Sequence, residues 1–152
     1  MANTYSQIYI HLVFAVKNEL YPINSEKKKD LYKYIEDIIT EKNQKLISIN
    51  GSFDHIHLFI SLKPEMKLSD LVRIVKSKSS KFINENNWTN GKFEWQKGYG
   101  AFSYSYSQIP EIIKYIETQE EEHNKKSFKE EYIELLNKFN IGYDENYLFE
   151  WI

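Results

Sequence analysis

The stretch KLISINGSFDHIHLFISL, residues 45–62, decides the fold expected for this chain. Residues 45–49 and 53–62 are two strand-like segments in which apolar side chains alternate with others. Asn50-Gly51 lies between them and is a strong short-range hairpin signal, because both residues tolerate positive φ. The sequence therefore predicts a β-hairpin over these residues.

The second arm of this hairpin carries two histidines, His55 and His57, two positions apart. Successive side chains of a strand face opposite sides, so the two imidazoles project together on one face of the sheet. Neutral imidazole is a common ligand of divalent cations. Histidines can also be plain polar residues on the outer face of a half-buried strand. The pair by itself leaves both interpretations open.

Composition describes a globular chain of ordinary size. Its 152 residues are 41% hydrophobic, contain no cysteine and carry a net charge of −2. We expect one domain over 1–152, without disulfides or thiolate metal sites, in the cytoplasm and without a membrane span. The basic residues concentrate in the body and the acidic ones in the C-terminal tail, so the body could still meet phosphates.

Periodicity along the rest of the chain predicts the order of elements. A strand is expected at 6–16, a helix at 26–42, the hairpin at 45–62, a helix at 67–86, a strand at 93–106, and a third helix from about 107. The order βαββαβ with a helical tail indicates an α+β, ferredoxin-like antiparallel sheet. Its first two helices would cover one face. The third helix is expected to cover the other, which carries the histidines.

The third helix contains the segment PEIIKYIETQEEEHNKK, residues 110–126. Tyr115 and Gln119 lie four residues apart, next to an apolar stripe, and so share one edge of the helix. A tyrosine hydroxyl can act as a nucleophile in phosphoryl transfer when a divalent metal on the phosphate assists it. Tyr115 could equally be an ordinary residue at the margin of the core.

Taken together, DHIHLFI and YIETQ resemble the two motifs of single-tyrosine HUH transposases of small insertion sequences. The HUH motif is His55-Ile56-His57, and the second motif is Tyr115-x-x-x-Gln119. The resemblance continues through KGYGAFSYSYSQI before the tyrosine helix and QEEEHNKKSFKEEYIELL after it, so it covers nearly the whole chain.

The resemblance implies a DNA transposase that cuts and rejoins single-stranded DNA. Tyr115 would form a 5′-phosphotyrosine, while His55, His57 and Gln119 would hold Mg²⁺ or Mn²⁺ on the scissile phosphate. The partners implied are hairpins at the ends of a mobile element and a second copy of the chain. In such a homodimer the tyrosine helix of one subunit completes the metal site of the other.

Other residues and other functions stay open. We expect His11 near the metal site but not as a ligand, and His123 on a solvated helix face. Arg73, Lys76 and Lys81 on the second helix are candidate phosphate contacts, although a solvated surface explains them equally well. The alternatives to an active transposase are a domesticated HUH nuclease that cuts repeated chromosomal hairpins and a catalytically inactive ferredoxin-like dimer that only binds nucleic acid or protein.

Overall fold

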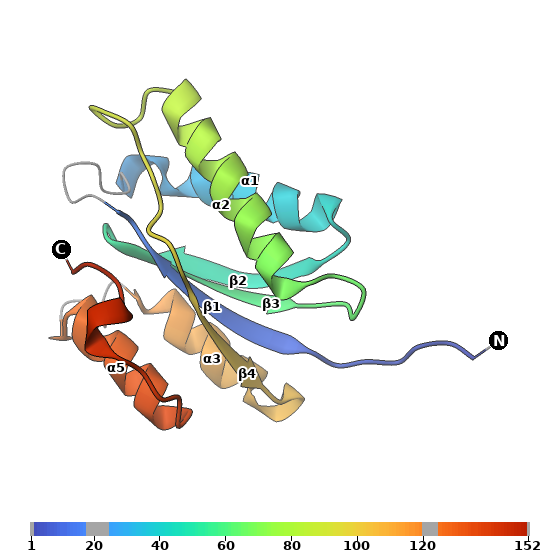
Figure 1. Ribbon diagram of the computed structural model, residues 1–152. Coiled ribbons are helices and arrows are strands. Elements are labelled where there is room, and N and C mark those ends of the chain that lie inside the picture. Colours follow the sequence, from blue (N-terminus) through green and yellow to red (C-terminus); the bar gives the residue numbers. More distant parts are fainter. Residues whose placement is uncertain (1, 18–24, 120–124, 152) are drawn as a thin grey trace.

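A four-stranded antiparallel sheet with helices on both faces makes up the computed structural model, which describes residues 2–17, 25–119 and 125–151 (Figure 1). The strands are β1 (Tyr9–Ala15), β2 (Lys45–Gly51), β3 (His55–Ser61) and β4 (Gly100–Tyr104). The α-helices are α1 (Lys28–Glu41), α2 (Leu68–Glu85), α3 (Ile109–Glu117) and α5 (Phe128–Lys138). Short 3₁₀ turns lie at Ser25–Lys27, Tyr106–Gln108 and Glu145–Tyr147. None of the helices in the described part of the chain is long and apolar enough to cross a membrane.

The strand order β2-β3-β1-β4 is that of the ferredoxin-like arrangement, as the sequence predicted. β3 lies inside the sheet, paired with β2 on one side and with β1 on the other. Interior strands have every backbone polar group in a ladder, which makes β3 a rigid base for its side chains. All of its residues except Ser61 are buried.

One face of the sheet packs against α1 and α2, which lie together on the same side (Figure 1). Each helix contributes an apolar stripe at helical spacing, and the even-numbered residues of β1 and β3 pack against these stripes. The members of this core include Phe14, Leu31, Ile35, Ile56, Leu58, Ile60, Leu71 and Val75. The helix predicted at 67–86 is confirmed as α2, and Phe82 at the edge of its apolar stripe stacks on Tyr34 of α1.

The opposite face of the sheet is covered by α3 and α5 (Figure 1). α3 places Ile112 and Ile116 against Phe59 of β3, which confirms the apolar stripe predicted for this helix. α5 begins at the N-cap Ser127, whose hydroxyl accepts the Glu130 backbone N–H. Its buried apolar residues join the main core. The face with the histidines therefore lies beneath two helices of the same chain.

The turn between β2 and β3 differs from the predicted one. Asn50 and Gly51 belong to the β2 ladder, where they pair with His57 and Ile56, and the chain reverses over residues 52–54. Gly51 is needed for close approach, since a Cβ there would lie 2.4 Å from the His55 carbonyl oxygen. The Asn50 amide instead donates to the carbonyls of Ile116 and Glu117 at 3.0 and 3.1 Å. It therefore ties the C-terminal end of α3 to the sheet.

The predicted strand at 93–106 is shorter in the structure. Only Gly100–Tyr104 forms β4, and Trp95 makes a single isolated bridge with Val16. Gly98, at φ +86°, breaks the extended path between the two. The aromatic residues before this break are buried, so their hydrophobicity reflects core packing rather than a continuous strand.

Candidate active site

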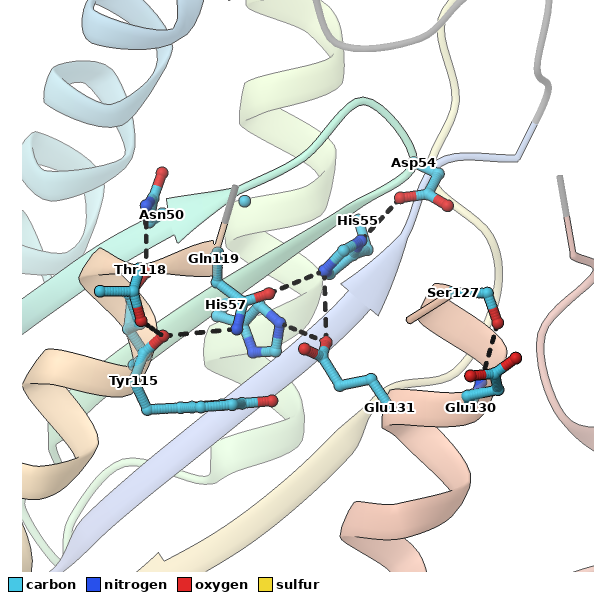
Figure 2. Close-up of polar contacts among 12 residues, drawn as sticks. Asn50, Asp54, His55, His57, Tyr115, Thr118, Gln119, Ser127, Glu130 and Glu131 are labelled. Atoms are coloured by element: carbon cyan, nitrogen blue, oxygen red, sulfur yellow. Dashed lines mark hydrogen bonds and ion pairs between the residues drawn. The ribbon is translucent and has the colours of Figure 1, made fainter. Parts of the chain in front are cut away.

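Four polar side chains converge in the interior between β3, α3 and α5 (Figure 2). His55 and His57 project from β3, Gln119 lies just after α3, and Glu131 comes from the first turn of α5. All four are buried, and none is more than 5% exposed. Buried polar groups are retained in proteins when they satisfy one another or bind a ligand. The structure thus brings together the three predicted ligands and adds a carboxylate.

The spacing of these groups fits a metal ion. The Nε2 atom of His57 lies 3.1 Å from Glu131 Oε1, and that of His55 lies 3.5 Å from the same oxygen. The Gln119 amide oxygen is 3.2 Å from His55 Nε2. Ligands about 2.1 Å from one cation and at right angles to each other are about 3.0 Å apart. His55, His57 and Glu131 could therefore hold a cation without rearrangement of the backbone.

His55 is held by two further groups. Its Nδ1 atom lies 2.7 Å from the Asp54 carboxylate, and its ring stacks on Phe128 of α5, with centroids 4.0 Å apart. A carboxylate on Nδ1 keeps the proton there and directs the lone pair of Nε2 toward a metal. Burial lowers the pKa of His55, but hydrogen bonds and charge from Asp54 and Glu131 outweigh it and raise the pKa to about 9.

His57 contacts a third histidine. His11 of β1 lies beside it, with its Nε2 atom 2.7 Å from His57 Nδ1. The two rings are almost parallel, with centroids 4.9 Å apart. Burial lowers the pKa of both histidines, and the charge of a neighbouring imidazole lowers each further, that of His57 for His11 and that of His55 for His57. Both rings are therefore neutral, as a metal ligand and its neighbour should be.

Tyr115 lies beside the same cluster. Its ring meets that of His57 edge to face, with centroids 5.7 Å apart, and that of His11 similarly at 6.0 Å. Gln119 is one turn further along the chain, and its amide lies 3.4 Å from the Tyr115 carbonyl oxygen. Burial raises the pKa of the Tyr115 hydroxyl strongly, and the Glu131 charge raises it further. In the metal-free chain this hydroxyl therefore keeps its proton.

Glu131 is the site residue that sequence reasoning missed. Burial raises the pKa of this carboxyl, but hydrogen bonds from His55 and His57 prevail and hold it well below its usual range. The signal was present in the segment FKEEYIELL, where an acidic residue occupies the buried stripe formed by Phe128, Tyr132 and Leu135. An acid in such a stripe needs a buried partner.

The histidine face of the sheet is covered within the single chain, so a partner's helix is not needed to bury it. In the single chain, α3 contacts β2 and β3 of its own sheet, and Tyr115 lies beside its own histidines. Assembly across a dimer stays a prediction from the resemblance.

The predicted DNA contacts differ in their surroundings. Arg73 is exposed and lines a cavity of about 740 Å³ between α2 and residues 94–99. Lys76 donates to the carbonyls of Gln96 and Gly98, at 2.8 and 2.6 Å, and burial lowers its pKa to about 8. Lys81 lies outside the lining of this cavity and pairs with Glu85 at 3.8 Å. His123, predicted on a solvated face, lies outside the described residues.

Comparison with known proteins identifies the family. The model of the IS200-like transposase family matches residues 4–119. The ISDra2 transposase TnpA of Deinococcus radiodurans is 27% identical over 120 residues, which cover 74% of this chain and 84% of that protein. The IS200 transposase of Salmonella typhimurium is 27% identical over 105 residues, with 65% of this chain and 68% of the relative covered.

Solved structures share the fold. A Deinococcus radiodurans crystal structure assigned as a transposase aligns with a TM-score of 0.60 at 22% identity, over 78% of this chain and 95% of that one. A REP-associated tyrosine transposase bound to a REP hairpin aligns with a TM-score of 0.58 at 12% identity, over 78% and 70%. The family match spans most of the chain and contains both histidines, Tyr115 and Gln119. This chain therefore belongs to the IS200-like transposase family.

Proposed function

We propose that this transposase cuts and rejoins single-stranded DNA through a covalent bond between Tyr115 and a 5′-phosphate, and so moves a small insertion sequence. The observation that carries the proposal is the position of Tyr115 next to a buried group of metal-ligand type. His55, His57 and Gln119 would hold Mg²⁺ or Mn²⁺, and Glu131 would join them. Family membership itself implies DNA cleavage and strand transfer.

The electrostatics of the site support a requirement for a cation. Without one, the Glu131 carboxylate opposes ionisation of Tyr115, which is already disfavoured by burial. A divalent ion held by His55, His57 and Glu131 would offset the Glu131 charge and polarise the scissile phosphate. Attack by Tyr115 would then cost less free energy. The Gln119 amide N–H donates to the Tyr115 backbone carbonyl while its amide oxygen faces His55, so this neutral residue links the tyrosine helix to the ligand set.

The bond changes balance without an added energy source. The Tyr115 oxygen bonds to phosphorus, the bond from phosphorus to the 3′-oxygen breaks, and the proton of the phenol ends on the 3′-hydroxyl. One phosphodiester is exchanged for another of similar energy, so attack by a different 3′-hydroxyl rejoins the strand. In the rejoining step the proton of the attacking 3′-hydroxyl returns to the Tyr115 oxygen, so the phenol ends as it began.

For the DNA we propose hairpin-bearing single strands. A structural neighbour is a tyrosine transposase bound to a REP hairpin, which supports this class of partner. The cavity beside α2 supplies a surface on which phosphates could bind, lined by Arg73, Lys97 and Lys17 as well as by serine hydroxyls. Glu94 offsets part of this charge through its ion pair with Lys17 at 3.0 Å. Arg73 and Lys97, both exposed, are the better candidates for phosphate contacts.

The first prediction tests the nucleophile. Tyr115→Phe should abolish the covalent adduct with a single-stranded oligonucleotide that carries the element's hairpin, while DNA binding persists, because only the attacking oxygen is removed. The adduct is detected by denaturing electrophoresis with 5′ sequencing of the attached strand. Tyr104→Phe is the matched control, since Tyr104 is also half-buried beside His11 but lies on β4. An adduct that survives Tyr115→Phe would assign the nucleophile to another residue.

The second prediction tests the metal. Mn²⁺ binding, followed by electron paramagnetic resonance, should strengthen about tenfold per pH unit as pH rises toward 9, because the ion competes with the proton on His55. EDTA should stop cleavage. Glu131→Gln should weaken binding by at least about tenfold. Glu130→Gln, its exposed neighbour on α5, should not. A Mn²⁺ affinity that is constant between pH 7 and pH 9 would contradict the competition.

The third prediction tests the DNA surface. Arg73→Ala and Lys97→Ala should each weaken binding of hairpin DNA. Each should also reduce the slope of the log binding constant against log salt concentration by about one, as expected when one phosphate contact is lost. Lys81→Ala should leave both unchanged, because this lysine lies outside the cavity. Fluorescence anisotropy at several salt concentrations measures both quantities. An effect of Lys81 equal to that of Arg73 would shift the DNA path to the outer face of α2.

The fourth prediction concerns the homodimer that the resemblance implies. A heterodimer of one Tyr115→Phe chain and one His57→Ala chain has one intact site if tyrosine acts in trans, and none if it acts in cis. We propose the trans arrangement that the resemblance implies, so we expect the heterodimer to recover cleavage although each homodimer is inactive. No recovery in a verified heterodimer would instead place each tyrosine with its own histidines, as α3 packs in the single chain.

A further inference from the structure

The two histidines of the HUH motif are supported on their far sides in different ways. The Nδ1 atom of His55 faces the Asp54 carboxylate, whereas that of His57 faces the imidazole of His11. An ionised carboxylate can only accept a hydrogen bond, so Nδ1 of His55 must be the donor. A neutral imidazole can either accept or donate, depending on which nitrogen carries its hydrogen. The proton position on His55 is therefore determined by its neighbour, and that on His57 depends on the tautomer of His11.

His11 is buried next to His57, so the nitrogen on which His11 carries its hydrogen affects the proton position of His57. Its ring is 0% exposed and lies against the rings of Phe102, Tyr104 and Tyr115. Its Nε2 atom contacts His57, and no polar atom of the described residues reaches its Nδ1. A buried histidine with one nitrogen unpaired carries an energetic cost, which core packing alone does not explain. Its contact with a metal-ligand histidine offers an explanation.

We propose that His11 is a positioning residue that sets the tautomer of His57, by accepting its Nδ1–H so that the Nε2 lone pair faces the metal. The proposal rests on the proposed function, because it requires the cation beside His57 and Glu131. It assigns the buried histidine of β1 a role in the site without making it a ligand. It also explains why β1, which contributes no ligand, places a polar ring directly beside β3.

Binding of a cation would rearrange the protons on His57 and His11 without changing the charge of either ring. The Glu131 carboxylate can only accept, so without a cation we infer that His57 carries its proton on Nε2 and that its Nδ1 accepts from His11 Nε2–H. When Nε2 is needed as a ligand, its proton leaves. The proton of the short hydrogen bond then moves from His11 to His57 Nδ1, and His11 takes up one proton at its Nδ1. Both rings remain neutral and keep one proton each.

Nitrogen NMR of histidine-labelled protein tests this directly, with Zn²⁺ as the diamagnetic probe. Wild-type His57 should be the Nε2–H tautomer without metal and the Nδ1–H tautomer with Zn²⁺. His55, held by Asp54, should carry its proton on Nδ1 in the Zn²⁺ form and serves as the internal reference. A Zn²⁺-bound His57 that keeps its proton on Nε2 would overturn the proposal without any variant.

Two substitutions of His11 separate positioning from packing. His11→Phe keeps a ring but removes the acceptor, and should weaken Zn²⁺ binding by about 10–100-fold in calorimetry. His11→Gln places an amide oxygen near the position of the imidazole Nε2, and should restore most of the affinity and the Nδ1–H signal of His57. Equal losses in both variants, with circular dichroism showing a native fold, would reduce His11 to a packing residue.

The outcomes also distinguish this inference from the proposed function. Wild-type protein that does not bind Zn²⁺, Mn²⁺ or Mg²⁺ at all would overturn the metal mechanism itself. Wild-type protein that binds metal through His55 and His57, but whose affinity and His57 tautomer are unchanged in His11→Phe, would overturn only the role of His11.

Discussion

The hydrogen-bonded contact of Glu131 with His55 and His57 is the interaction on which the rest of the structure depends. It joins the last α-helix to the central strand through groups that water does not reach. A buried carboxylate is stable only when its charge is compensated, so α5 must dock where the two imidazoles are. Once it docks, its apolar residues complete the core above the sheet. One polar contact thus determines both where α5 lies and what the site contains.

This contact also determines the charge of the site. The carboxylate raises the pKa of His55 and opposes ionisation of Tyr115, so the metal-free site favours protons on both. A cation between the imidazoles and the carboxylate would reverse both tendencies, because it replaces the proton and offsets the negative charge. In the reaction proposed above, the same residues would keep Tyr115 protonated without a cation and would allow it to ionise beside one.

α5, which lies beyond the residues that match the family, contributes two side chains that contact the histidines of the candidate site. The part of the chain that matches the family ends at Gln119, whereas Phe128 and Glu131 come from α5, which lies after it. Phe128 stacks on the His55 ring and Glu131 contacts both imidazoles. The buried polar group around His55 and His57 accordingly includes side chains from a segment outside the matched region.

The sequence by itself determined the element order, the face shared by His55 and His57, and the helix edge shared by Tyr115 and Gln119. These follow from local periodicity, and the resemblance added their chemistry. Only the tertiary structure decided the partners that complete the site, because Glu131 contacts His57 across 74 positions and His11 does so across 46. The structure likewise places the hairpin turn at residues 52–54, because Asn50 and Gly51 pair with β3 instead of forming the turn. Contacts between segments so distant in sequence depend on how helices dock on the sheet, and no local pattern encodes that.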